Sequence, residues 1–186
     1  METIVRSYHI DIYYTMSLLR KVGSVALGVF FSNVGIMHFK PRQIKQFVKI
    51  YPRYLPLPEF MVVLTGVGEL GGGLGLLAST LFPKQYGPLR ESSALFLIHL
   101  VVLMSLANIE MAVNNRTIWG NRLSKRGHFF RFCAQIVLLY CLRSLTSSTS
   151  PEVRDKYIAY NAIITLCVAI VGHSVGPTDA VATKAM

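Results

Sequence analysis

The stretch "VVLTGVGELGGGLGLL" at residues 62–77 decides how this chain folds. Its Gly66, Gly68 and Gly71 have the spacing of a dinucleotide-binding turn, and an acidic residue, Glu91, follows twenty positions after the last of them. That turn requires a preceding strand and a following helix with a solvated face, inside a βαβ unit. Here the next residues, "GGLGLLASTLF", carry no charge, and another apolar run follows them. The sequence therefore argues against a nucleotide site and for an apolar helix.

The composition of the whole chain favours a membrane protein. Of its 186 residues, 52% are hydrophobic and 15% are charged, and the mean hydropathy is +0.45. Average soluble domains carry about 25% charged residues, so this chain has too few polar side chains to cover a soluble globule. The formal charge of +10 comes from basic residues set between apolar runs. Because these residues do not gather on one polar face, we expect no nucleic-acid partner.

Four apolar segments are long enough to cross a bilayer, which takes about 20 residues of helix. They lie at residues 22–39, 60–82, 93–113 and 129–145. We predict an all-α fold, a polytopic transmembrane four-helix bundle at residues 17–146, preceded by an N-terminal segment at 1–16. Residues 147–186 form a Ser/Thr-rich linker and a tail. A fifth C-terminal helix at 157–175 either crosses the membrane or lies along its surface.

The basic residues predict the orientation in the membrane. The loops at residues 40–58 and 114–128 contain lysines and arginines and no acid. The loop between the second and third segments has only Lys84 and Arg90, set against Glu91. Both basic loops fall on one side of the predicted bundle, and the positive-inside rule places that side in the cytoplasm or the matrix.

The first basic loop contains an amphipathic pattern. Apolar residues recur at helical spacing from Ile44 to Tyr51, while Lys45 and Lys49 fall on another face. The pattern predicts a short helix that lies among the lipid headgroups, with its lysines towards anionic lipid. An ordinary solvated loop is the alternative.

Glycines in the second segment have the spacing of a helix-packing surface. Gly68, Gly71, Gly72 and Gly75 follow the small-xxx-small pattern that lets membrane helices approach closely, so we predict that this helix is central to the packing. Glu69 lies among them, where a carboxylate costs about 2.5–3.5 kcal/mol on insertion scales. It should therefore face the interior of the bundle and be hydrogen-bonded.

Polar residues of three other segments fall in the same half of the membrane as Glu69. They are His38, Asn108, Arg131 and Gln135. Glu110 points about 200° away from Asn108 at 100° per residue, so we assign Asn108 to the interior and Glu110 to a basic partner at the interface. The cluster is either a static network that fixes the helix register or a ligand or proton site.

No residue pattern predicts a metal site. Cys133, Cys141 and Cys167 lack metal-ligand and C-x-x-C spacings and lie in apolar segments, as structural thiols do. His38 and His99 fall in different halves of the membrane, which argues against a haem held by two histidines.

Several motifs resemble those of the DoxX-like family of small four-helix membrane proteins. They are "GIMHF" (residues 35–39), P-x-Y-L-P-x-P (52–58), "LTGVGELGGGLGLL" (64–77), "ANIEMA" (107–112) and "RFCAQ" (131–135). The resemblance implies a subunit or accessory of a membrane redox system, because better-known members resemble the membrane subunit of a thiosulfate:quinone oxidoreductase. It also implies quinone as the candidate cofactor. The polar motif positions that it marks are His38, Glu69, Asn108, Arg131 and Gln135.

Two functions stay open at this point. In the first, the polar cluster binds a quinone headgroup or relays a proton; Glu69 or His38 exchanges the proton, and Asn108 and Gln135 bond a carbonyl. In the second, the protein is a non-catalytic scaffold whose small-residue surface packs against another subunit of a membrane complex. The sequence does not decide whether the protein is an enzyme. The partners that it suggests are the lipid bilayer and other membrane or redox subunits.

Overall fold

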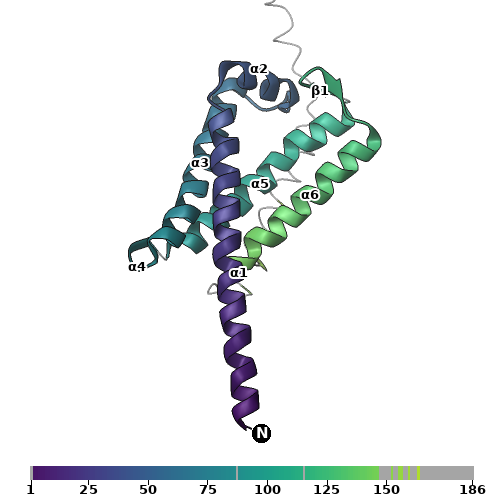
Figure 1. The fold of residues 1–186 in the computed structure, drawn as a ribbon. Helices are drawn as coiled ribbons and strands as arrows, with labels where there is room; N and C mark the ends of the chain where they lie inside the picture. Colours follow the sequence, from purple (N-terminus) through teal and green to yellow (C-terminus); the bar gives the residue numbers. More distant parts are fainter. Residues whose placement is uncertain are drawn as a thin grey trace, which may run out of the picture.

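The computed structural model describes residues 2–86, 88–114 and 116–146, together with residues 152, 155, 156, 159 and 163, and it describes side chains from Ser17 onward. This part of the chain is mostly helical (Figure 1). The helix predicted at 157–175 lies outside the described residues except at positions 159 and 163.

Four long helices form the body of the protein: α1 (Glu2–Met37), α3 (Pro58–Leu81), α5 (Leu89–Val113) and α6 (Lys125–Ser144). The connections contain two short helices, α2 (Pro41–Ile50) and α4 (Pro83–Tyr86), and the strands β1 (Thr117–Ile118) and β2 (Asn121–Arg122). Three of these helices, α2, α3 and α4, begin with proline. Proline suits a first helical turn because its φ is already helical and its missing N–H would have no partner there.

Within the described residues, three helical stretches are long and apolar enough to cross a membrane: Ser17–Met37 in α1, Pro58–Leu81 and Leu89–Val113. The fourth predicted segment forms α6, a helix of 20 residues, but it is not among the three. Arg131 and Arg143 lie within it and lower its hydropathy. The structure thus confirms a helical protein with three membrane-length helices.

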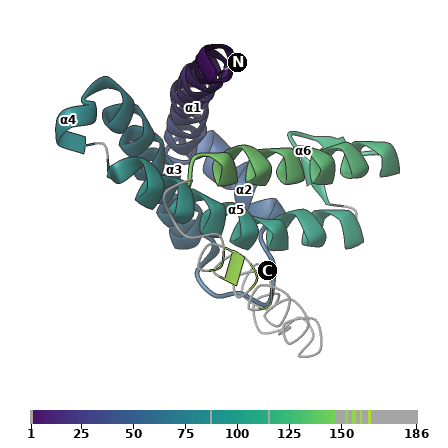
Figure 2. The same cartoon turned by 90° about the horizontal axis from the view of Figure 1, so that it is seen from below.

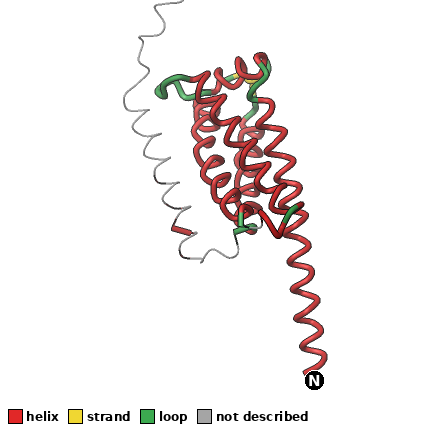
Figure 3. Tube along the Cα trace, turned by 90° about the vertical axis from the view of Figure 1, so that its left-hand side faces the viewer, coloured by secondary structure: helices red, strands yellow, loops and turns green. Residues whose placement is uncertain are grey.

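The first helix is much longer than the predicted apolar segment. It has 36 residues and begins at Glu2. Its N-terminal part extends past the ends of the other long helices (Figures 1 and 3). At 1.5 Å per residue it is about 54 Å long, against about 30 Å for the hydrocarbon core of a bilayer.

The long helices pack side by side with α3 in the central position. It contacts α1 on one side and α5 on the other, and α6 packs against α5 (Figure 2). The main apolar core lies among these four helices; its buried residues are Phe31, Leu76, Ala94, Leu97, Ile98, Val101, Leu142 and Leu145.

Four glycines bring α1 and α3 into backbone contact. Gly28 faces Gly73 and Gly35 faces Gly66, so two pairs with the same seven-residue spacing meet on antiparallel helices. A Cβ on Gly73 would lie 2.8 Å from the carbonyl oxygen of Gly28. A Cβ on Gly35 would lie 2.9 Å from the carbonyl oxygen of Gly66. These separations are too short for any side chain larger than hydrogen, so the helices approach this closely only because all four residues are glycines.

The glycines that we predicted to pack do not all do so. Gly68, Gly72 and Gly75 face side chains of α5. Gly71 is exposed, and no described heavy atom lies within 4 Å of the place its Cβ would occupy, so it packs against no described helix. Small-xxx-small spacing alone does not reveal which of these glycines meets a neighbouring helix.

A second, smaller core lies at one end of the bundle, between α2, α5 and the β-hairpin. Its buried residues are Ile50, Met111 and Ile118, with Phe47 and Leu123 packed against them. The apolar face of α2 therefore packs against protein, where we had expected lipid headgroups, because the hairpin that follows α5 folds back over it. Lys45 and Lys49 are exposed on the other face of α2.

The hairpin turn places a tryptophan against α2. Trp119 and Gly120 have φ of 52° and 79°, and positive φ at both central residues is typical of the type I′ turn. The Trp119 Nε1–H donates to Gln43 Oε1 at 2.8 Å, and its backbone N–H donates to Gln46 Oε1 at 3.1 Å. These bonds tie the two basic loops together, so both lie at the same end of the molecule (Figure 1).

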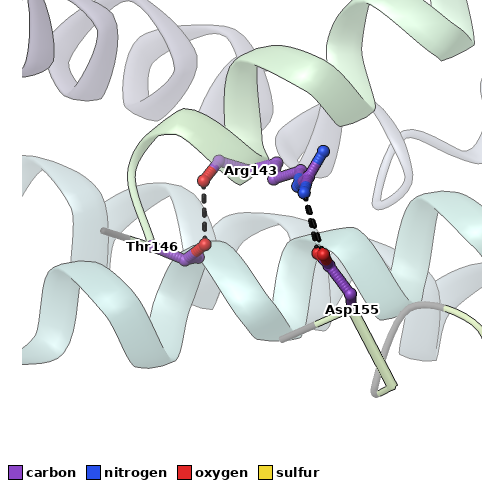
Figure 4. Close-up of polar contacts among 3 residues, drawn as sticks. All are labelled: Arg143, Thr146 and Asp155. Carbon is purple, nitrogen blue, oxygen red and sulfur yellow. Dashed lines mark hydrogen bonds and ion pairs between the residues drawn. The ribbon is translucent and has the colours of Figure 1, made fainter. Parts of the chain in front are cut away.

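The end of α6 carries an exposed ion pair. Arg143 Nη2 lies 2.9 Å from Asp155 Oδ1 and 3.1 Å from Oδ2, and the Thr146 hydroxyl donates to the Arg143 carbonyl at 2.8 Å (Figure 4). The Arg143 and Asp155 side chains are 43% and 50% exposed. Solvent screens such a pair, and it contributes at most about 1 kcal/mol to stability.

The replacement Gly73→Ala should destabilise the contact between α1 and α3. The new Cβ would lie 2.7 Å from the backbone nitrogen of Ser32, so α1 must move away, at a cost of about 1–3 kcal/mol. In mild detergent, the Tm of the purified protein should fall by about 2–10 °C. Gly71→Ala is the matched control in the same helix and should not lower the Tm. Equal Tm values for the two variants would contradict the glycine contact.

Candidate functional site

A cavity of about 640 Å³ lies between α3 and α5, below α2 and the 51–57 loop. Most of its lining is apolar. The polar residues that line it are His38, Tyr51, Thr65, His99, Asn108 and Arg131. None of the described residues in this lining is acidic. The volume is that of sites which bind drug-sized molecules.

The cavity is elongated along the helix axes. Its α5 wall runs from Phe96 to Asn108, which is about 18 Å at the rise of an α-helix. His38, Asn108 and Arg131 belong to the end nearest α2, whereas the rest of the α3 and α5 walls is mostly apolar. A polar end and an apolar length match an amphipathic molecule.

A buried pair, His38 and Glu69, stands at the polar end. His38 Nδ1 lies 3.1 Å from Glu69 Oε2 and 3.0 Å from the carbonyl oxygen of Val34. The two side chains are 7% and 1% exposed. The Val34 carbonyl can only accept a hydrogen bond, so Nδ1 carries a hydrogen. In the neutral ring, Nε2 is then the nitrogen that can accept a proton.

Two contacts hold the His38 ring in place. The ring stacks on Phe47 of α2, with centroids 4.3 Å apart and planes at 13°. Its Cβ lies directly over Gly66, where an added methyl group would overlap it. The contact between Gly35 and Gly66 therefore also sets the position of His38, and Glu69 lies one helical turn along α3 from Gly66.

Glu69 is fully buried and incompletely hydrogen-bonded. Its Oε1 has no hydrogen-bond partner among the described residues. Its Oε2 is close enough to His38 Nδ1 for an ion pair, but the contact lacks hydrogen-bond geometry, so we regard it as electrostatic. We had expected Glu69 to face the interior and to be hydrogen-bonded; it does face the interior, but it has a charged neighbour, His38, and no hydrogen bond to a described residue. A buried carboxyl group with an open bonding position is costly in a membrane and usually serves a function.

The structure separates the five predicted site residues into two groups. Those that line the cavity are His38, Asn108 and Arg131. Glu69 lies behind His38, outside the lining. Gln135 is also outside it, and its Nε2 donates to Ser105 Oγ at 3.5 Å. Of the two amides that we assigned to a carbonyl group, only Asn108 is placed to meet a ligand.

Glu110 pairs with a basic residue near the end of α5, as we had expected. Its Oε1 lies 2.9 Å from Arg116 Nη2, and the side chains are 5% and 20% exposed. Tyr54 of the first basic loop lies close by. Burial and the negative charge of Glu110 both raise the pKa of the Tyr54 hydroxyl above its ordinary value. The pair joins α5 to the loop that leads into the hairpin.

Sequence reasoning missed the roof of the cavity. The periodicity of α2 marks Phe47 as part of an apolar face, but it does not show that this face meets His38. Sequence reasoning also placed His38 and His99 far apart along the helices. Both residues line the same cavity, because the cavity is long enough to reach from one to the other.

The fold and the cavity define a helical protein with three membrane-length apolar helices and an elongated, mostly apolar site. Residues 27–146 match the model of a family described as a domain of unknown function, DUF8561. The match covers more than half of the chain, and the chain belongs to this family. The matched range includes every residue that lines the cavity. No match was found among curated proteins or among solved structures.

The replacement Arg116→Gln should destabilise the protein by leaving the Glu110 carboxylate buried without its cation. Loss of one member of a buried pair costs up to about 3–5 kcal/mol, and the partial exposure of Arg116 reduces this value. The Tm should fall for Arg116→Gln and stay unchanged for Arg122→Gln, an exposed arginine of β2. The double replacement Glu110→Gln with Arg116→Gln should recover most of the loss. A double variant no more stable than Arg116→Gln would show that the pair contributes nothing.

Proposed function

We propose that the protein is an integral membrane protein whose four long helices cross the bilayer around the cavity. The three membrane-length helices support this, as do large apolar side chains on their outer faces, such as Leu18, Val67 and Leu74, which are 51–62% exposed. The outer face of α6 is also apolar; Phe129, Phe130, Ile136, Val137 and Tyr140 are exposed along it. Such surfaces are unfavourable in water and suit contact with lipid or with another membrane subunit.

In this arrangement the α2 end faces the cytoplasm or the matrix. The two basic loops lie together at this end, and neither the 40–58 nor the 114–128 loop contains an acid. Short loops rich in lysine and arginine stay on that side during insertion. Their charges then lie near the anionic headgroups of the same leaflet.

The cavity is a site for an amphipathic molecule that dissolves in the membrane. The observation that carries this part of the proposal is the polar end, where His38, Asn108 and Arg131 line a cavity whose walls are mostly apolar. Arg131 Nη1 donates only to Met111 Sδ, at 3.7 Å, among the described residues, and sulfur is a weak acceptor. The guanidinium therefore retains donors for an oxygen of the ligand head.

The ligand that we propose is a quinone, and the protein is then a subunit or accessory of a membrane redox system, as the resemblance to the DoxX-like family suggests. The carbonyl oxygens of a quinone accept hydrogen bonds from Asn108 and Arg131. Its reduction to a quinol takes two electrons, which come from a partner redox protein, and two protons. The protons pass through His38, which lines the cavity with its ring and meets Glu69 at Nδ1.

Glu69 acts on the ligand through His38. Its carboxylate favours the tautomer with hydrogen on Nδ1 and stabilises the imidazolium that forms when Nε2 takes up a proton. This is the role that a buried acid plays beside a catalytic histidine in other enzymes. Glu69 is therefore a positioning residue, which holds the His38 ring and offsets its positive charge without taking its proton.

The replacement Glu69→Gln should lower quinone-dependent turnover by about 100-fold or more, because a neutral amide cannot stabilise the imidazolium. The measurement is quinone reduction by membranes that contain each variant and its native electron donors. Resistance to alkaline extraction shows whether the variant is inserted, and this should not change. Glu59→Gln, at the exposed start of α3, is the control. Unchanged turnover in Glu69→Gln would refute the proton route.

The replacement Arg131→Gln should weaken quinone binding by about tenfold, which corresponds to one charge-assisted hydrogen bond of about 1.5 kcal/mol. Binding can be followed by the quenching of Trp119, the one tryptophan of the chain, in protein held in lipid nanodiscs. Arg126→Gln lies five residues earlier in α6, is exposed, and should bind as the wild type does. If both replacements weaken binding equally, the effect is one of general surface charge, and Arg131 does not contact the head.

A further inference from the structure

One long side of the cavity is left uncovered by the described residues. Leu64 and Val67 of α3, and Phe96 and Leu103 of α5, all line the cavity, yet each is between 36% and 54% exposed. These residues form the facing edges of α3 and α5 on the outer surface. In the membrane, this side of the cavity faces lipid chains.

The end of the cavity near α2 is closed by comparison. Ile50 and Pro52, which line this end, are buried. A hydrogen bond within the 51–57 loop, from the Tyr51 hydroxyl to the Pro56 carbonyl at 3.1 Å, stabilises the shape of this loop. Phe47 covers His38 by stacking. A ligand therefore reaches the polar end more readily from the side than through the loops.

Gly68 marks the narrow point of the open side. A Cβ at this position would lie 3.2 Å from Phe96 Cζ and 3.3 Å from Leu100 Cδ2. Gly68 also lines the cavity. Phe96 and Leu100 thus lie close to the α3 backbone here, and any residue larger than glycine would take up the remaining space between α3 and these two side chains.

The size of the cavity indicates how a long-chain ligand must lie. A volume of about 640 Å³ suits a ring and the first part of a chain. The long chain of a membrane lipid or carrier exceeds it, so the remainder must leave the protein. The open side at Gly68 is the part of the wall where an apolar chain can pass from the cavity into the bilayer without crossing polar residues.

We propose that the cavity is loaded from the bilayer through the opening between α3 and α5 at Gly68, and that its ligands carry a polar head and one long apolar chain that leaves through this opening. The inference rests on the proposed ligand site, and it adds the path by which the ligand enters and the apolar chain that the ligand carries. It makes Gly68 a residue that determines chain specificity. A side chain at this position closes the opening to the chain but leaves room for the head within the cavity.

The test compares two probes that share a head. One is 2,3-dimethoxy-5-methyl-1,4-benzoquinone, which has no chain, and the other is its decyl derivative. Binding is measured by quenching of Trp119 in nanodiscs. In Gly68→Leu, the dissociation constant of the decyl probe should rise at least about tenfold, while that of the head-only probe should stay within about twofold of wild type. In Gly71→Leu, the matched control in open space on the same helix, neither value should change.

A second variant tests the same opening in case Gly68→Leu does not fold. Val67 is 54% exposed at the edge of the opening, so Val67→Phe can narrow the gap without entering the main core. It should also weaken binding of the decyl probe selectively, and Leu74→Phe, exposed on α3 but outside the cavity lining, should not.

The outcomes separate this inference from the proposed function. If Gly68→Leu and Val67→Phe both weaken the binding of the decyl probe but not that of the head-only probe, the lateral path is supported. Equal binding of the decyl probe in wild type and both variants, or equal weakening of the two probes, overturns the lateral path and leaves the quinone site standing. Binding of neither probe to the wild-type protein overturns the quinone site and the inference together.

Discussion

The structure depends on the backbone contact between α1 and α3. Gly28 and Gly35 meet Gly73 and Gly66, and added Cβ atoms at these positions would lie 3.0 Å or less from backbone atoms of the opposite helix. Close approach of this kind replaces the hydrophobic driving force, which is absent between helices in lipid, with dispersion contacts over a long interface. It also carries a polar consequence, because His38 follows α1 directly and lies over Gly66. The same contact that joins the helices therefore sets a histidine beside a buried carboxyl group.

The polar end of the cavity is enclosed by the segments that connect the long helices, and these segments pack around His38. The α2 helix turns back over the end of the bundle and supplies Phe47 to stack on His38. The hairpin holds α2 there through the bonds of Trp119 to Gln43 and Gln46. Residues from α3 and α5 then form an apolar wall that continues away from the polar end. The elongated cavity thus joins ionisable groups at one end to exposed apolar side chains along its side.

Much of this architecture is predictable from the sequence, and the reasons for the exceptions are physical. The lengths of the apolar runs predicted the helices at 60–82 and 93–113 closely, since each helix follows its apolar run almost from end to end. The spacing of small residues predicted the importance of α3 but assigned Gly71 to packing, because spacing shows a stripe and not the neighbour it faces. Depth in the membrane grouped His38 with Glu69, but it also grouped Gln135, which instead bonds with Ser105. The hairpin was not predicted because Trp119 and Gly120 are an unusual pair for a type I′ turn. The contact of the hairpin with α2, through Gln43 and Gln46, is visible only in the structure.

The length of α1 gives the protein a mechanical property. The paired glycines fix the register of α1 against α3, since sliding by one residue would drive side chains into the opposite backbone, whereas a small tilt about the crossing would keep these pairs in register. From the middle of the crossing, Glu2 lies about 44 Å away along the helix and His38 about 10 Å away in the other direction. The helix is therefore a lever with unequal arms. A displacement of about 4 Å at the Glu2 end would move His38 by about 1 Å, which is about a third of the 3.1 Å between its Nδ1 and Glu69 Oε2.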